Sequence, residues 1–208
     1  MIKVGHMALG MYQTNCYFLH NEDSSDVIVF DPADSGDYIY DSLKKNRLNV
    51  KAIVLTHGHF DHIYGVNKLR ELSGAKVYSY IGEAKLLEDE NLNCSASVGR
   101  PAHVACDEYL HDGEEITLAD MKFKTLYTPG HTEGSACYFF EEDKLLIAGD
   151  TLFCESIGRS DLPTGSGKTL IDSITNKLMV LPDDVTVYPG HGESTTIGNE
   201  RAYNPFLN

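Results

Sequence analysis

The stretch V-L-T-H-G-H-F-D-H, residues 54–62, places three histidines and one aspartate directly after an apolar run. The metal-binding types of side chain in it are His57, His59, Asp61 and His62. In a loop that leaves a buried strand, such side chains can converge on one volume. Imidazole nitrogens and carboxylate oxygens are the ligands that borderline divalent metals prefer. The stretch therefore predicts a metal site, whereas a lone histidine would indicate only a polar surface loop.

Three more residues of the same chemistry stand at the ends of other expected strands. His131 closes T-P-G-H at 128–131, and His191 closes Y-P-G-H at 188–191. Asp150 follows the apolar run L-L-I-A-G, which has no structural need to end in a carboxylate. Because α/β sheets place their sites at strand ends, we expect these three residues to lie beside the first four.

Hydrophobic periodicity predicts strands and helices that alternate in two halves of the chain. Expected strands cover 16–20, 27–30, 52–55, 115–118, 121–127, 135–140, 144–148 and 185–188. Expected helices cover 37–48, 63–72, 82–92 and the segment around 170–178. This order predicts an α/β sandwich with its helices outside, and the 208 residues suit one domain over 1–208.

Composition excludes several classes of protein. The chain has 31 acidic and 17 basic residues, a formal charge of −14, which argues against nucleic-acid and anionic-membrane partners. The apolar runs are too short to span a bilayer, and the N-terminus lacks the apolar core of a signal peptide. Five cysteines without C-x-x-C spacing indicate reduced thiols, so we expect a cytoplasmic protein. The sequence leaves the oligomeric state open.

The order H-x-H-x-D-H, G-H, G-D-T, G-H resembles the metallo-β-lactamase superfamily. This resemblance implies a four-layer αβ/βα sandwich with a metal site at one edge, between the two sheets. It implies two divalent metal ions, zinc in the first place and iron or manganese as alternatives. The implied ligands are His57, His59 and His131 for the first ion, Asp61, His62 and His191 for the second, and Asp150 as a bridge.

Other segments resemble the glyoxalase II-like, or hydroxyacylglutathione hydrolase-like, branch. They are Q-T-N-C-Y-F-L at 13–19, T-P-G-H-T-E-G-S at 128–135 and G-R-S-D-L at 158–162. Only 17 residues follow His191, so we expect no counterpart of the helical domain that binds glutathione in full-length glyoxalase II. The resemblance implies hydrolysis of a small thioester and leaves the thiol carrier open. Asp150, where several β-lactamases have a cysteine ligand, argues against antibiotic degradation.

Chemistry explains why this set suits hydrolysis. Two divalent ions about 3.5–4 Å apart can share a bridging water and lower its pKa, so that the hydroxide attacks the thioester carbonyl. We expect Asp61 to orient that hydroxide. We also expect Thr56 and Thr132 to accept hydrogen bonds from the metal-binding imidazoles of His59 and His131, although simple turn chemistry would explain both threonines.

Arg159 is the candidate for binding the substrate, because a lone arginine at the pocket rim could hold a substrate carboxylate. The alternative is an Arg159–Asp161 pair that fixes the loop. The segment L-P-T-G-S-G-K-T at 162–169 resembles a phosphate-binding loop but has Leu162 at its first glycine position. We therefore expect a turn there, followed by the start of a helix.

Two rival functions remain open at this point. His57, His131 and Asp150 could form the two-histidine, one-carboxylate site of a mononuclear Fe(II) enzyme, as the resemblance to persulfide dioxygenases implies. The chain could also be a metal-binding partner domain without turnover. Metal stoichiometry separates the first rival from the hydrolase.

Overall fold

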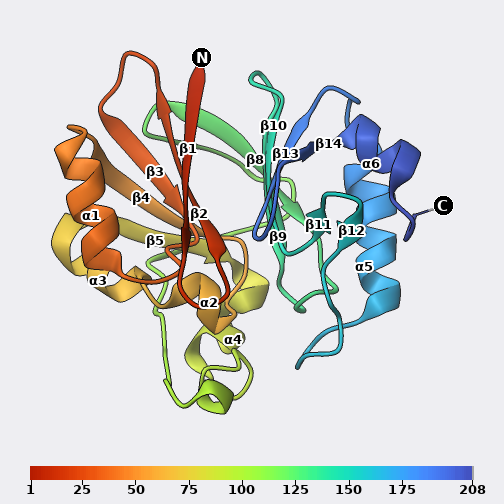
Figure 1. Cartoon of the computed structure of the whole chain (residues 1–208), viewed down its shortest axis with the longest axis horizontal. Coiled ribbons are helices and arrows are strands. Elements are labelled where there is room, and N and C mark those ends of the chain that lie inside the picture. Colours follow the sequence, from red (N-terminus) through yellow and green to blue (C-terminus); the bar gives the residue numbers. More distant parts are fainter. Residues whose placement is uncertain (208) are drawn as a thin grey trace.

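Two six-stranded sheets pack face to face and carry helices on their outer sides, which confirms the predicted four-layer αβ/βα sandwich of the metallo-β-lactamase type (Figure 1). The structure is a computed structural model and describes residues 1–207. The first sheet has the spatial order β1 (Ile2–Leu9), β2 (Thr14–Asn21), β3 (Asp26–Phe30), β4 (Asn49–Leu55), β5 (Lys76–Tyr80), β6 (Glu108–Leu110). Its first three strands are antiparallel, and the strands from β3 to β6 are parallel.

The second sheet also has six strands and is formed by the other half of the chain. Its spatial order is β14 (Thr195–Thr196), β13 (Thr186–Pro189), β10 (Leu145–Gly149), β9 (Ala136–Phe140), β8 (Met121–Tyr127), β7 (Glu115–Leu118). Strands β10 and β13 are parallel, and the other neighbours are antiparallel. A small ribbon of β11 (Leu152–Phe153) and β12 (Ser156–Ile157) lies beside this sheet.

Helices cover the outer faces, α1 and α3 on the first sheet and α5 and α6 beside the second (Figure 1). The helices are α1 (Gly36–Lys45), α2 (Phe60–Ile63), α3 (Val66–Ser73), α4 (Ala84–Glu88), α5 (Gly167–Ser173) and α6 (Ile197–Tyr203), with short turns η1 (Ile81–Glu83) and η2 (Ala96–Val98) and a π-helical turn η3 (Ile174–Leu178). No helix within residues 1–207 combines the length and the apolar character needed to cross a membrane.

Three apolar clusters fill the three interfaces between the layers. Strand β3 contributes to two of these clusters, because successive residues of a strand buried on both faces point to opposite sides of the sheet. Ile28 and Phe30 pack between the sheets, whereas Val27 and Val29 pack toward α1 and α3. Phe30 contacts Phe123 of the opposite sheet, with ring centroids 6.3 Å apart. This aromatic contact ties the two halves together directly behind the site.

The four strands that precede the predicted site residues end at one edge of the sandwich. They are β4, β8, β10 and β13. Backbone hydrogen bonds join the loops at this edge across the two sheets: Asn15 N donates to Gly190 O at 2.7 Å, and Ala136 N to Thr56 O at 3.0 Å. The two sheets therefore meet where the histidine-bearing loops begin.

Several expected elements have different bounds in the structure. The helix expected over 63–72 is divided at Gly65, whose N–H donates to Pro32 O at 2.8 Å and interrupts the helical bonding. The helix expected over 82–92 is only the turn η1 followed by α4. Strand β5 was not predicted, because the polar Ser79 occupies a fully buried position in it and hides its alternation. Strand β6 was not predicted either, because its three residues are too few to show a periodicity. The phosphate-loop look-alike is a turn, and Ser166 caps α5.

Candidate metal centre

All seven sequence-predicted ligand residues lie in one cluster at the shared edge of the sheets. Three overlapping groups have ligand atoms within 4.8 Å of one another: His57, His59 and His131; His57, His62 and Asp150; and Asp61, His62 and His191. The segment after β4, which runs through a short loop into α2, supplies four of the seven residues, and the segments after β8, β10 and β13 supply one each. Apolar strands end at the cluster and place polar side chains where the sheets part.

The first group is a convergence of three imidazole nitrogens. His59 Nδ1 lies 2.9 Å from His131 Nε2, which in turn lies 3.2 Å from His57 Nε2. All three side chains are buried. Burial and, after it, the neighbouring His131 lower the pKa of His59 to about 3, so the ring is neutral at physiological pH. Burial is also the main cause that lowers the pKa of His57 and of His131. Three neutral nitrogens that face one another at this distance suit a cation between them.

The other two groups add the carboxylates of Asp61 and Asp150. His191 Nε2 lies 3.3 Å from Asp61 Oδ2, and His62 Nε2 lies 3.3 Å from Asp150 Oδ1. Asp150 Oδ2 lies 3.5 Å from His191 Nε2 and 3.6 Å from His131 Nε2. This carboxylate therefore lies between the group with His57, His59 and His131 and the group with Asp61, His62 and His191. His62 Nε2 and Asp150 Oδ1 are buried without a hydrogen-bond partner among the described residues. Buried polar atoms of this kind require a partner, and a metal ion supplies one.

The electrostatics favour a positive charge at this place. Burial opposes ionisation of Asp61, but His62, His191 and Thr14 outweigh it and lower the pKa of this carboxyl to about 2. Burial likewise acts to lower the pKa of His191, yet its contacts with Asp150 and Asp61 raise it to about 9. A site that stabilises an extra positive charge beside two ionised carboxylates fits divalent cations.

Asp31 is a site residue that the sequence analysis missed. Its Oδ2 lies 2.9 Å from His62 Nδ1 and accepts a hydrogen bond from Thr56 Oγ1 at 2.7 Å, while Oδ1 accepts from Thr56 N at 2.8 Å. The carboxylate thereby fixes the ring of His62. The sequence held a usable signal, because Asp31 follows the apolar run of β3 just as Asp150 follows β10.

Glu83 is the second missed residue, and it joins two of the histidine loops. Its buried carboxylate accepts hydrogen bonds from Gly58 N at 2.9 Å, from Gly134 N at 3.0 Å and from Thr132 Oγ1. Gly58 lies between His57 and His59, and Thr132 and Gly134 follow the third histidine of the first group. A Cβ at Gly134 would lie 2.3 Å from the backbone of Gly82, so glycine is required for this approach.

The predicted roles of two threonines are wrong. Thr56 Oγ1 lies 3.1 Å from Nδ1 of His57, not beside His59. His131 Nδ1 instead donates to the carbonyl oxygen of Arg159 at 2.7 Å. Thr132 turns away toward Glu83. Thr56 thus contacts the ring that directly follows it in the sequence, whereas the ring of His131 is oriented by a carbonyl group of a distant segment.

Arg159 forms the loop pair that was the alternative to substrate binding. Its guanidinium donates to Asp161 Oδ1 at 2.7 Å and Oδ2 at 2.8 Å, and both side chains are exposed. Arg159 also lines the cavity over the cluster, so its role toward substrate stays a prediction.

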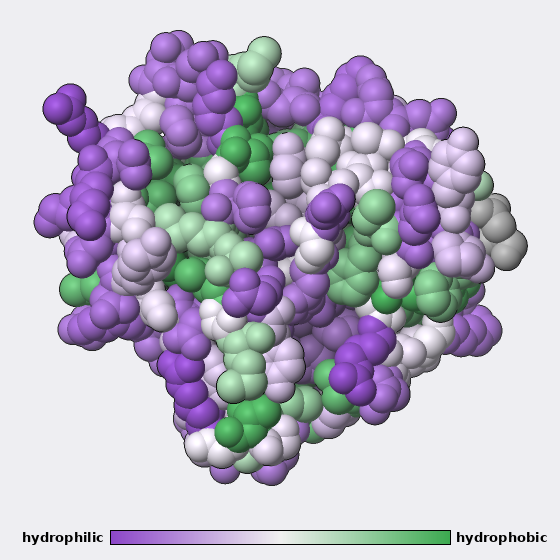
Figure 2. All heavy atoms as spheres, viewed as in Figure 1, coloured by the Kyte–Doolittle hydropathy of each residue, from purple (hydrophilic) through white to green (hydrophobic). Residues whose placement is uncertain are grey.

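A cavity of about 530 Å³ opens over the cluster. Besides the ligand residues it is lined by Tyr12, Phe60, Phe153 and Ile157, among others. In the space-filling view this face of the molecule is hollowed between its two halves, and hydrophilic groups line much of the hollow (Figure 2). The cluster is therefore accessible to a small molecule, with apolar side chains around its rim.

Comparison with known proteins agrees with this geometry. The family model described as "Metallo-beta-lactamase superfamily" matches residues 9–191. The chain belongs to the metallo-β-lactamase superfamily. It is 34% identical to the hydroxyacylglutathione hydrolase GloC of Haemophilus influenzae, with 95% of this chain and 94% of GloC covered. These superfamily relationships make the chain a metallo-hydrolase by family.

Two solved structures are similar over nearly the whole superfamily domain. The B3 metallo-β-lactamase BLEG-1 has a TM-score of 0.94 and 40% identity, with 99% of both chains covered. TTHA1623, solved in a di-iron-bound form, has a TM-score of 0.88 and 32% identity, with 98% of this chain and 100% of that chain covered. Because a chain named as a β-lactamase is 40% identical, Asp150 in place of a cysteine ligand does not separate this protein from every β-lactamase.

Proposed function

We propose that this superfamily member is a dinuclear metal-dependent hydrolase of small thioesters. The observation that carries the proposal is that two groups of ligand atoms, each within 4.8 Å, share one accessible cavity, with Asp150 reaching both. The similarity to the hydroxyacylglutathione hydrolase GloC supports a thioester as the substrate class.

His57, His59 and His131 would hold the first ion, and Asp61, His62 and His191 the second, with Asp150 between them. When bound, divalent ions would lower the pKa of a water molecule and polarise the substrate carbonyl. Zinc is the metal we propose. Iron and manganese are the alternatives, and the di-iron form of TTHA1623 makes iron the first of these to test.

Asp61 is the residue that we assign to the attacking water. Thr14 Oγ1 donates to Asp61 Oδ2 at 2.9 Å and fixes the carboxylate at the floor of the cavity. With its pKa lowered to about 2, Asp61 stays ionised at neutral pH and can accept a hydrogen bond from the water. This contact holds the water toward the scissile carbonyl.

Two observations favour the hydrolase over its rivals. A mononuclear iron site built from His57, His131 and Asp150 would leave the Asp61–His62–His191 group without a function. A partner domain without turnover would not need the cavity of about 530 Å³ above the cluster.

Metal analysis and a substrate panel test the proposal. Protein purified without chelator should hold two divalent ions per chain and hydrolyse S-lactoylglutathione and S-acetyl thioesters. His59→Ala and Asp150→Ala should lose metal and activity together. One iron per chain with oxygen uptake on glutathione persulfide would favour the dioxygenase, and cleavage of a chromogenic cephalosporin without thioesterase activity would favour a β-lactamase. Full thioesterase activity in both alanine variants would overturn the metal mechanism.

A further inference from the structure

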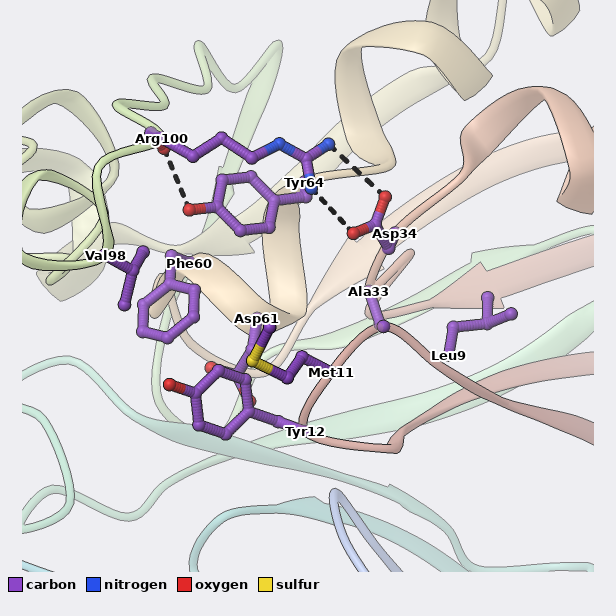
Figure 3. A pocket seen from close by; sticks show the side chains of 11 residues that line it. Leu9, Met11, Tyr12, Ala33, Asp34, Phe60, Asp61, Tyr64, Val98 and Arg100 are labelled. Atoms are coloured by element: carbon purple, nitrogen blue, oxygen red, sulfur yellow. Dashed lines mark hydrogen bonds and ion pairs between the residues drawn. The ribbon is translucent and has the colours of Figure 1, made fainter.

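A second cavity, of about 400 Å³, lies against the metal cluster on the side of the β1–β2 hairpin. Figure 3 shows it from close by: the tip of the hairpin, the short helix α2 and the segment after η2 surround it. Most of its lining is apolar or aromatic, from Leu9, Met11, Tyr12, Phe60, Tyr64 and Val98.

This cavity continues from the one over the metal centre. Tyr12, Phe60, Asp61 and Val98 line both cavities. The rings of Tyr12 and Phe60 meet edge to face, with centroids 5.2 Å apart, and form the partition between the two spaces. A substrate whose scissile bond lies over the cluster can therefore extend past this partition without leaving the protein surface.

Exposure of apolar side chains points to an occupant. Met11 is 91% exposed, more than any other large apolar side chain of residues 1–207, and Val98 is 43% exposed. They come from separate segments and stand at one cavity. Apolar side chains gathered in this way mark a surface that a ligand covers.

The charges at the cavity select an uncharged occupant. Arg100 donates to Asp34 Oδ2 at 2.7 Å and Oδ1 at 3.3 Å, and its guanidinium lies 3.9 Å from the centre of the Tyr64 ring. This pairing leaves no free cation in the lining to attract a carboxylate. The remaining charged side chain in the lining is Asp61, whose charge is compensated once it holds the second ion of the proposed function.

We propose that this cavity is the binding site for the apolar acyl group of the thioester substrate. The inference rests on the proposed function and names its substrate class: acyl thioesters with a medium-length aliphatic or an aromatic acyl group. The polar thiol portion then lies in the metal cavity, whose lining includes Arg159.

A chain-length series tests the inference. Acetyl, butyryl, hexanoyl, octanoyl and benzoyl thioesters of one thiol, N-acetylcysteamine, are assayed with the metal-loaded enzyme. We expect kcat/KM to rise by about twofold to fourfold per added methylene until the cavity is filled, as burial of methylenes predicts. A flat series would overturn the inference while leaving thioester hydrolysis intact.

Two variants test this apolar lining, and Met11→Asp places the effect at this cavity because Met11, unlike Val98, lines this cavity alone. Met11→Asp and Val98→Asp, on separate segments, should each lower the octanoyl-to-acetyl ratio of kcat/KM at least tenfold. Val180→Asp is the matched control, because Val180 is 71% exposed and lies outside both cavities, so its ratio should equal that of the wild type. An unchanged ratio in both cavity variants would count against the inference.

A binding measurement decides the matter independently of turnover. Octanamide, an uncharged probe, should bind the wild type and Val180→Asp in calorimetry and bind at least tenfold more weakly to Met11→Asp and Val98→Asp. Absence of hydrolysis for every thioester would refute the proposed function, whereas failure of octanamide to bind the wild type would refute the acyl site itself.

Discussion

Replacement of Glu83 by glutamine should destabilise the protein in a pH-dependent way. An amide keeps one oxygen and puts an NH2 group in place of the other. In one orientation that group faces Gly58 N–H, and in the other it faces Gly134 N–H, which now donate at 2.9 and 3.0 Å. One buried backbone donor therefore loses its acceptor, at a cost of about 1–3 kcal/mol.

The wild-type side chain avoids this cost when it is protonated. Burial raises the pKa of Glu83 to about 7, despite the hydrogen bonds that favour its ionised form. Below that pH the carboxyl O–H can donate a hydrogen bond to Thr132 Oγ1, whose own hydroxyl then donates to Ser135 Oγ, 2.6 Å away. Both backbone donors keep their acceptors, so Glu83→Gln should be less stable than the wild type by about 1–3 kcal/mol at pH 5.

The difference should shrink as the pH rises. The folded pKa of Glu83, about 7, lies above the reference value of 4.5, so the folded state binds more protons between these two values. Wild-type stability from this group is fully present at low pH and falls through that window by up to about 3 kcal/mol. Glutamine does not titrate, so at pH 8 the two proteins should be equally stable, or the variant more so.

Urea unfolding followed by circular dichroism, with chelator at both pH values, measures these differences. Glu71→Gln is the matched control, since Glu71 is an exposed partner of Lys68 and should change stability by less than about 0.5 kcal/mol at either pH. A Glu83→Gln deficit that is the same at pH 5 and pH 8, or no deficit at pH 5, would refute the reasoning.

Three further predictions concern the metal centre. Asp31→Asn should weaken binding of the ion held by His62 by about 10- to 100-fold, measured by competition with a chromophoric chelator, and an unchanged affinity would contradict the role of the 2.9 Å contact. Gly190→Ala should lose bound metal in elemental analysis, because its Cβ would lie 2.2 Å from Asp150 Oδ1 and 2.7 Å from His62 Cε1. Gly167→Ala, whose methyl group would meet only the Ser160 side chain, should retain the wild-type metal content. Arg159→Ala should raise KM for S-lactoylglutathione with kcat unchanged if the guanidinium binds a substrate carboxylate; an unchanged KM would leave it only its pairing with Asp161.

The seven clustered residues could be predicted because each signal is local. A run of apolar residues that ends in histidine or aspartate is visible in the sequence, and parallel strands bring such ends to one edge. Asp31 carried the same signal but stands alone after its strand, without a neighbouring histidine. Asp150 is equally isolated, but it belongs to the G-D-T motif of the superfamily resemblance, whereas Asp31 belongs to none of the motifs that carry this resemblance.

Glu83 could not be predicted in this way. Its position looked like one more polar residue of the helix expected over 82–92. Its burial depends on Gly58, Gly82 and Gly134, which come close only after both sheets have packed. The same reason explains the errors at Thr56 and Thr132: orientation of a metal-binding ring is set by contacts between distant segments, which sequence spacing does not record.

The hydrogen bonds of Asn15 have a consequence for how the protein unfolds. Its side-chain amide donates to Pro189 O and Gly192 O, both at 3.0 Å, so the second strand of the first sheet holds the loop that carries His191. The place of His191 in the ligand cluster therefore depends on contacts between β2, near the beginning of the chain, and the loop after β13, near its end. Any ion bound there adds its binding free energy to this long-range closure. Metal removal should thus appear in hydrogen exchange first as faster opening of β2 and β13, well before the aromatic contacts between the sheets are lost.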